Sequence, residues 1–259
     1  MLFNASTIHG YTIVASDGHL GTVSDFLFDD ATWMVRWLVV DTGTWLPGRK
    51  VLLPPMALGH PNSSDREFPV RLSRQQVKGS PDIDTARPVS RQMEHHVYDH
   101  YGWSPYWDTG VYMGGFGYPD SLAPMPQIPA CRRRAEAEMV AREYEGDPHL
   151  QSIGDVTGYL IHATDGEIGH VESMLLDDTD WGIRFLVVDT TNWLSGKKVL
   201  IPPGSASDVN WSDKLVNLKV DRQHVLDSPE YDESMVIDRA YVRRFDTHYN
   251  DVLGPGERR

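Results

Sequence analysis

The chain has 259 residues, and 24 Lys and Arg against 37 Asp and Glu give it a net charge of −13 at pH 7. An acidic surface repels phosphate backbones, so we expect no nucleic acid partner. The single cysteine, Cys131, excludes an intramolecular disulfide. No segment resembles a signal peptide or an apolar span of about 20 residues. We therefore expect a cytoplasmic protein without direct membrane insertion.

The sequence contains one unit twice. Asp17-Gly18 recurs as Asp165-Gly166, and His100-Tyr101 recurs as His248-Tyr249, in both cases 148 positions later. A constant offset of this length indicates a duplicated domain rather than a solenoid with a period of about 20–50 residues. The predicted divisions are copy one (1–101), a Gly/Pro/aromatic linker with a short helix (102–152), copy two (153–250) and a tail (251–259).

Copy one begins with an alternating pattern over 11–15 that predicts a strand. Asp17-Gly18 then predicts a tight hairpin turn, because Gly accepts the positive φ that such a turn needs. The return strand is expected over 21–28. The apolar segment 35–41 does not alternate, which favours a central strand covered on both faces. Two short strands are expected after it, over 50–53 and 68–72.

Helical signals close each copy. Ser73 and Gln76 fit a capping box, in which the hydroxyl and the amide each bond a backbone N–H. A second helix is expected over 90–100, and its counterpart over 238–247. Copy two repeats the strands of copy one, over 159–163, 169–176, 183–189, 198–201 and 215–220. A helix is also expected in the linker, over 130–145.

These elements resemble the PRC-barrel family, the small β-barrel of the photosynthetic reaction-centre H subunit and of the ribosome maturation factor RimM. The residues that carry the resemblance are Asp17-Gly18, Gly21-Thr22-Val23, Leu38-Val39-Val40-Asp41 and Val51-Leu52-Leu53-Pro54. Their counterparts in copy two are Asp165-Gly166, Gly169-His170-Val171, Leu186-Val187-Val188-Asp189 and Val199-Leu200-Ile201-Pro202. The resemblance implies a mainly β fold with short helices, built as two small antiparallel barrels in a pseudo-twofold duplicate, and it looks like the tandem proteins of bacteria.

The resemblance also implies a non-enzymatic protein-interaction or assembly module with no cofactor. The alternatives are a component resembling the H subunit and linked to photosynthetic electron transfer, or a metal-binding protein. Two arrangements of the copies are open: an internal pseudo-dimer, which we favour because each small barrel leaves edges to cover, or two independent units on a linker. Whether the chain also forms a homodimer is left open.

The candidate chemical residues each have a structural alternative. In the group of His95, His96 and His100, the last two are four residues apart, a helical spacing that could serve a metal, yet the further ligands of a zinc site are not apparent. Asp41 and Asp189 could serve acid–base catalysis, but an aspartate that ends a strand more often accepts loop N–H bonds. Asp29-Asp30 and Asp177-Asp178 could hold a cation or form turns. We therefore assign no catalytic residue and no metal ligand.

Partner binding is assigned to two kinds of residue. Trp45 and Trp193 each lie in a loop, where an indole either anchors a partner or covers the core. Trp33 and Trp181 carry the same two interpretations. The matched basic pairs could seat an acidic partner or protect an edge strand from pairing with another chain. The predicted binding residues are Trp45, Trp193, Arg49, Lys50, Lys197 and Lys198.

Overall fold

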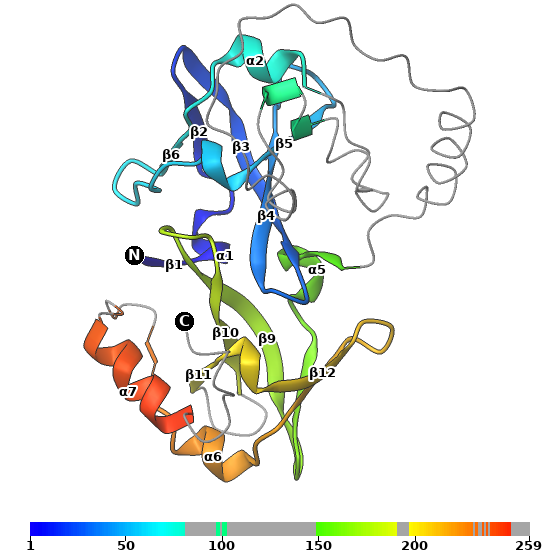
Figure 1. Cartoon of the computed structure of the whole chain (residues 1–259), viewed down its shortest axis with the longest axis vertical. Helices are drawn as coiled ribbons and strands as arrows, with labels where there is room; N and C mark the ends of the chain where they lie inside the picture. The colour runs from blue at the N-terminus through cyan, green and yellow to red at the C-terminus, as the bar shows by residue number, and fades with distance from the viewer. Residues whose placement is uncertain are drawn as a thin grey trace, which may run out of the picture.

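The computed structural model describes residues 1–80, 97–98, 100–102, 149–190, 197–229, 231–232, 235, 237 and 239–249. These residues form a mainly β structure with short helices and two mixed sheets, one built largely from each copy (Figure 1). The expected linker helix over 130–145, His95, His96 and Trp193 lie outside the described residues.

The sheet of copy one has the strand order β5-β4-β3-β2-β6. Its bounds are β2 (Thr12–Ala15), β3 (Gly18–Asp29), β4 (Met34–Asp41), β5 (Lys50–Leu53) and β6 (Glu67–Pro69). The predicted hairpin is confirmed, because Ala15 pairs with Gly18 and Gly18 has a φ of 135°. A glycine is required there, since other residues rarely adopt such a conformation.

Copy two repeats this sheet in the order β11-β10-β9-β8-β13-β12. Its bounds are β8 (Leu160–Ala163), β9 (Gly166–Asp177), β10 (Ile183–Asp189), β11 (Lys198–Ile201), β12 (Ala206–Asn210) and β13 (Leu215–Leu218). β12 was not predicted from the sequence. The expectation of purely antiparallel pairing was wrong, because β6 runs parallel to β2 and β13 runs parallel to β8. In each copy, a crossover connection separates the parallel strands, so no tight hairpin sets their direction.

Each copy contributes one short strand to the other copy's sheet. β1 (Leu2–Asn4) pairs with β9, with Leu2 opposite Asp177. β7 (Leu150–Ser152) pairs with β3, with Leu150 opposite Asp29. The two contacts are equivalent under the 148-residue offset, so the exchange is reciprocal. The linker predicted over 102–152 therefore ends in a strand that belongs to the neighbouring sheet.

Short helices flank the sheets. After the exchanged strands come α1 (Ala5–Ile8) and α5 (Ile153–Val156), and the last strands lead into α2 (Arg74–Lys78), α6 (Arg222–Leu226) and α7 (Arg239–Tyr249). One-turn helices η1 (Pro55–Ala57) and η3 (Pro203–Ser205) follow β5 and β11. The capping box of Ser73 and Gln76 is confirmed in α2, and the helix expected over 238–247 is α7.

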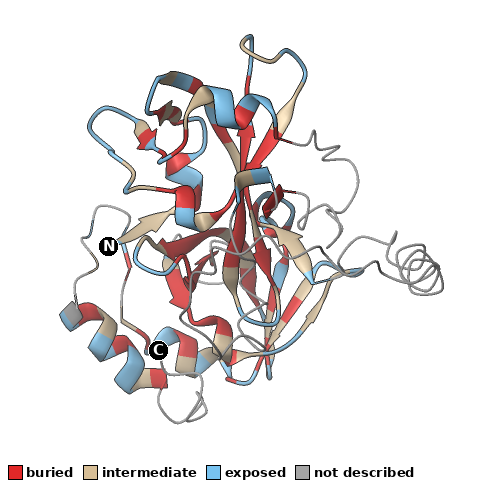
Figure 2. Ribbon diagram, turned by 45° about the horizontal axis from the view of Figure 1, so that its top comes forward, coloured by how far each residue is buried: buried red, intermediate tan, exposed pale blue. Residues whose placement is uncertain are grey.

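The central strands are covered on both faces, as their unbroken apolar runs predicted. In β4, Leu38 and Val40 belong to the main core, whereas Trp37 and Val39 lie in a second cluster with Val97. In β10, Phe185 meets Phe245 of α7 with ring centroids 4.6 Å apart. Figure 2 shows the buried residues gathered on the sheets, with mostly exposed or half-buried turns around them.

The two copies also interlock through the turns that precede β4 and β10. Trp33 and Trp181 have φ values of 55° and 63°, a left-handed conformation that is unusual for a large side chain. The N–H of Val35 donates to the carbonyl of Trp181 at 2.9 Å, and that of Ile183 donates to the carbonyl of Trp33 at 2.8 Å. These reciprocal bonds hold the strained turns against each other across the junction.

The indoles of these turns have different surroundings. Trp181 is 6% exposed and lies among Phe3, Phe26 and Phe68, with ring centroids 5.7, 6.4 and 5.8 Å away. All three phenylalanines belong to copy one. Trp33 is half-buried and stacks on Phe28 of its own copy at 5.4 Å. Trp181 is thus a core residue at the junction, which decides between the two interpretations of that indole.

Candidate functional site

The predicted anchor Trp45 lies in a shallow groove at the surface of copy one. The groove is lined by Asp17, Trp45, Arg74, Gln75 and Lys78. The indole is half-buried and packs on the core with part of its surface, as a residue that covers the core would, while it also lines the groove. The guanidinium carbon of Arg74 lies 4.8 Å from the centroid of the indole. This distance is within the range of a cation–π contact.

The local sequence explains how Arg74 reaches Trp45. Ser73 caps α2, so Arg74 is the first residue of the helix. Its backbone N–H donates to Oδ1 of Asp17 at 2.6 Å, which ties the helix start to the turn between β2 and β3. A cap and a hairpin turn, distant in sequence, therefore fix the backbone from which this arginine extends over Trp45.

The groove carries two cationic groups that have no anionic partner among the described residues. Neither the guanidinium of Arg74 nor the ammonium of Lys78 forms a hydrogen bond or an ion pair with another described residue, and Nε of Arg74 is buried without an acceptor. Asp17, the acidic residue of the groove, already accepts the backbone N–H of Arg74. The groove thus presents an aromatic surface next to available donors, which suits binding to an anionic group.

The structure also gives the surroundings of the predicted basic pairs. Arg49 donates from Nη2 to the carbonyl of Ser80 at 2.8 Å. Lys50 is the first residue of β5, opposite Asp41, and Nζ of Lys198 pairs with Glu172 at 2.6 Å. Lys197 is exposed and precedes β11. Because β5 and β11 end their sheet orders, these lysines fit the edge-strand interpretation better than a shared site with Trp45.

The equivalent position in copy two differs in charge. The backbone N–H of Arg222 donates to Asp165 at 2.8 Å, as Arg74 does to Asp17. The guanidinium of Arg222, however, packs so closely on Gly166 that a Cβ there would meet it at 2.5 Å. Lys78 is replaced by Leu226, which is 40% exposed. The second copy therefore keeps the backbone frame but not the pair of cations.

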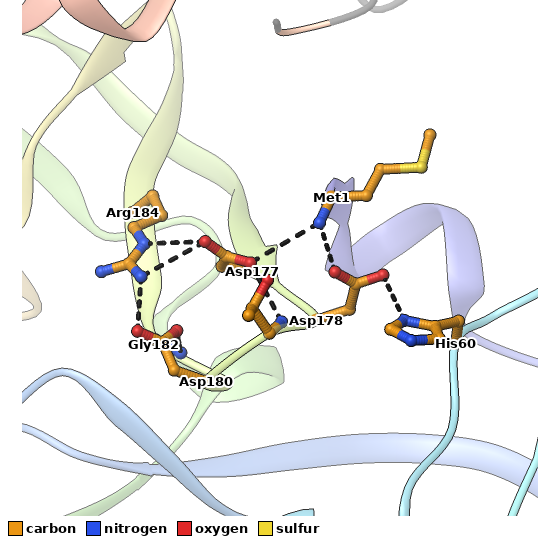
Figure 3. Close-up of polar contacts among 8 residues, drawn as sticks. Met1, His60, Asp177, Asp178, Asp180, Gly182 and Arg184 are labelled. Carbon is orange, nitrogen blue, oxygen red and sulfur yellow. Dashed lines mark hydrogen bonds and ion pairs between the residues drawn. The ribbon is translucent and has the colours of Figure 1, made fainter. Parts of the chain in front are cut away.

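A second polar cluster joins the copies where β1 meets β9 (Figure 3). One carboxylate oxygen of Asp178 accepts a hydrogen bond from the α-ammonium of Met1. The other oxygen lies 2.7 Å from Nδ1 of His60. Asp177 pairs with Arg184 at 3.2 Å. Burial acts to raise the pKa of Asp177, but hydrogen bonds from Thr179 and the charge of Arg184 outweigh it, so this pKa is lowered. The cluster connects three segments that are distant in sequence and leaves no carboxylate unpaired.

Copy one has a matching cluster with different members. His149 takes the place of Met1 and pairs through Nδ1 with Asp30 at 2.8 Å, while Arg36 pairs with Asp29 at 3.3 Å. The paired aspartates are thus turn and junction residues, in line with the turn interpretation. Sequence reasoning missed the partners, because the 148-residue offset gives no sign that His149 contacts Asp30.

A further polar pair connects each exchanged strand to the strand with which it pairs. Asp25 of β3 accepts from the hydroxyl of Ser152 and, at 3.1 Å, from the N–H of Gly154. Burial raises the pKa of Asp25, and the bond from Ser152 opposes this. In copy two, the hydroxyl of Ser173 donates to the side-chain carbonyl of Asn4. The donor and the acceptor have therefore changed places between the copies.

The remaining candidates show structural contacts. Nε2 of His100 lies 2.7 Å from the carbonyl of Gln76, so it ties the helix residues near position 100 to α2. Asp41 accepts the N–H of Gly43 at 2.8 Å, the loop contact expected of an aspartate that ends a strand. Across the described ranges, no three His, Cys, Asp or Glu side chains are grouped as a metal site would require.

Among the residues with described structure, no helix has the length and apolar character needed to cross a membrane.

The chain was also compared with known proteins. A search of curated proteins found no match to the chain. The model of the PRC-barrel domain family matches residues 1–63, which include β1 through η1 and the loop holding Trp45. Residues 1–63 of copy one are therefore similar to the PRC-barrel domain family.

Proposed function

We propose that this chain is a non-enzymatic PRC-barrel protein that binds another protein through the Trp45 groove of copy one. In this proposal, the two copies form a pseudo-twofold pair of small barrels that serves as a rigid frame. The exchange of β1 and β7 and the interlocked turns at Trp33 and Trp181 support the frame. A rigid frame favours binding because the site does not have to be ordered when the partner arrives.

The observation that carries the proposal is the state of Trp45. Its indole is held on one side by the core and by Arg74, while the rest faces the groove. Tryptophan and arginine are among the residues enriched at the energetic centres of protein interfaces. The indole is therefore both positioned and accessible, as an anchor for a partner must be.

Site-specific photo-crosslinking tests this proposal. A photoreactive amino acid at Gln75, which lines the groove, should yield a defined crosslinked protein in cells that express the full chain. The matched control is the same amino acid at Gln223, the equivalent position of copy two. We expect the crosslink from position 75 to be lost in Trp45→Ala and largely kept in Trp45→Phe, which retains a ring under Arg74.

Thermal melting of the same variants separates binding from folding. A free-energy loss of about 1 kcal/mol lowers the melting temperature of a folded unit the size of the two interlocked copies by roughly 2–4 °C. We expect Trp45→Ala to stay within that range because its indole is only half-buried. A crosslink that persists in Trp45→Ala, or one that position 223 gives equally well, would contradict the proposal.

A further inference from the structure

We propose that the Trp45 groove binds an acidic protein segment in extended conformation, with carboxylates at two alternate positions. This inference rests on the proposed function, whose site it makes more specific. It names the chemistry of the partner from the two cations of the groove, Arg74 and Lys78, and from the indole between the partner and the core.

The first cation selects for a planar anion. A guanidinium can form two parallel hydrogen bonds to one carboxylate, and its orientation decides whether this geometry is available. The stack on Trp45 and the fixed backbone N–H orient the guanidinium of Arg74, and it has no acceptor among the described residues. One carboxylate of the partner would therefore meet Arg74 at the edge of the indole.

The second cation sets the spacing. Arg74 and Lys78 are four residues apart in α2, so they lie on the same helix face with Cβ atoms about 5–6 Å apart. In an extended segment, side chains at alternate positions point the same way and are about 6.6 Å apart. The two distances match, so carboxylates at alternate positions could reach both cations, whereas adjacent residues of a strand point to opposite faces.

The charge of the whole protein makes this groove distinctive. The chain carries a net charge of −13, which repels acidic segments from most of its surface. An acidic partner would therefore be directed to the place where cations lack counter-charges. In copy two, Leu226 stands where copy one has Lys78, so that copy does not offer the same pair. We accordingly expect one site per chain.

Fluorescence anisotropy with synthetic peptides tests the inference on the full chain. The probe is a fluorescein-labelled octapeptide of Ser, Val and Gly with glutamates at two alternate positions. One comparison peptide has glutamines at those positions, and another has the two glutamates adjacent. We expect the first to bind with one site per chain, and both others to bind at least about fivefold more weakly. Binding should weaken further as salt screens the charges.

Variants locate the binding. Arg74→Gln should weaken the binding of the alternate-glutamate peptide about tenfold or more, and Lys78→Leu, which installs the residue of copy two, several-fold. The matched control is Arg222→Gln, which alters the equivalent arginine of copy two and should leave the affinity unchanged. Melting temperatures of the variants check that each one is folded.

Several outcomes would overturn the inference. These are equal binding of the glutamate and glutamine peptides, an equal effect of Arg74→Gln and Arg222→Gln, or saturable binding of anionic lipid vesicles or RNA to Arg74 in place of the peptide. If position 75 still crosslinks a protein that depends on Trp45 while Arg74→Gln leaves that crosslink intact, the binding function stands and the acidic partner is excluded. If position 75 yields no Trp45-dependent crosslink and the alternate-glutamate peptide does not bind, the proposed function itself is excluded.

Discussion

The two copies share a backbone frame but differ in how their side chains use it. Trp181 of copy two is enclosed by Phe3, Phe26 and Phe68, whereas the equivalent residues around the other turn are Gln151, Met174 and Val216. Trp33 therefore lacks the aromatic enclosure and stacks on Phe28 instead. Duplication preserved the strained turn, and the two junction contacts then diverged in packing.

The same contrast appears at the surface. Arg74 and Arg222 both begin a capped helix that is tied to an Asp-Gly turn, yet only copy one places a lysine one turn later. A duplicated frame can thus keep its structural contacts twice and specialise one surface. Substitutions at equivalent positions separate what the frame requires from what one copy alone uses.

The largest difference is expected at the junction tryptophans. Removing a large buried aromatic side chain costs about 3–5 kcal/mol, and Trp181 is 6% exposed at the centre of the junction. We expect Trp181→Ala to lower the free energy of unfolding by an amount in this range. Trp33→Ala should cost about half as much or less, because its indole is half-buried. Denaturant titrations of both variants would measure this; equal losses would refute the asymmetry.

A requirement shared by both copies is expected at two glycines. A Cβ added at Gly21 would lie 2.0 Å from the carbonyl oxygen of Asp41, and one added at Gly169 would lie 1.9 Å from that of Asp189. Overpacking of this kind costs about 1–3 kcal/mol. Gly21→Ala and Gly169→Ala should therefore destabilise the protein similarly. Gly10→Ala is the control: its φ of 77° adds strain, but nothing lies within 4 Å of the added Cβ. A milder effect at either site than at Gly10 would contradict the close approach.

Opposite pH dependences are expected for two aspartates. The pKa of Asp25 is raised in the folded protein. Its contribution to the free energy of unfolding is therefore fully present below the ordinary pKa of 3.8 and is lost as the pH rises through the pKa of the folded state. The lowered pKa of Asp177 means that its contribution is present above 3.8 and is lost as the pH falls through its folded value. Stability measured against pH should therefore flatten above 3.8 in Asp25→Asn and below 3.8 in Asp177→Asn.

The Asp25→Asn variant also reproduces in copy one the type of polar pair that copy two has. It would create an Asn–Ser pair with Ser152, as Asn4 and Ser173 form in copy two. We therefore expect Asp25→Asn to be at least as stable as the parent at neutral pH. A loss of stability at neutral pH would show that the charged carboxylate is needed by Ser152 and Gly154.

The smallest effects are expected at the junction histidines. Exposed ion pairs contribute about 0–1 kcal/mol, and the side chains of His60 and His149 are 77% and 58% exposed. Without His60, Asp178 still has the ammonium of Met1, whereas His149 is the ion-pair partner found for Asp30 among the described residues. Comparing the thermal unfolding of His60→Ala and His149→Ala, we expect the second to be more affected. A larger loss from His60→Ala would overturn this order.

Local signals in the sequence predicted much of the fold. Three examples are the Asp17-Gly18 turn, the Ser73 capping box and the unbroken apolar run of β4. Each reflects a preference that acts over a few residues, so it can be predicted without knowledge of tertiary contacts. The same applies to the tandem repeat, which is a property of the chain itself. Trp45 was predicted as a binding residue, but Arg74 and Lys78 were not, because a lone cation in a helix carries no signal of what it faces.

The sequence by itself determined that two similar β units occur in tandem, where most strands begin, and which turns need glycine, because backbone sterics and hydrophobic patterning act locally. Tertiary structure alone decided the exchange of β1 and β7, since a three-residue strand is too short to show a period and gains its partner only across the chain. It also decided the burial of Trp181 and the assembly of the groove from a hairpin turn, a loop and a helix, because these contacts join residues far apart in sequence.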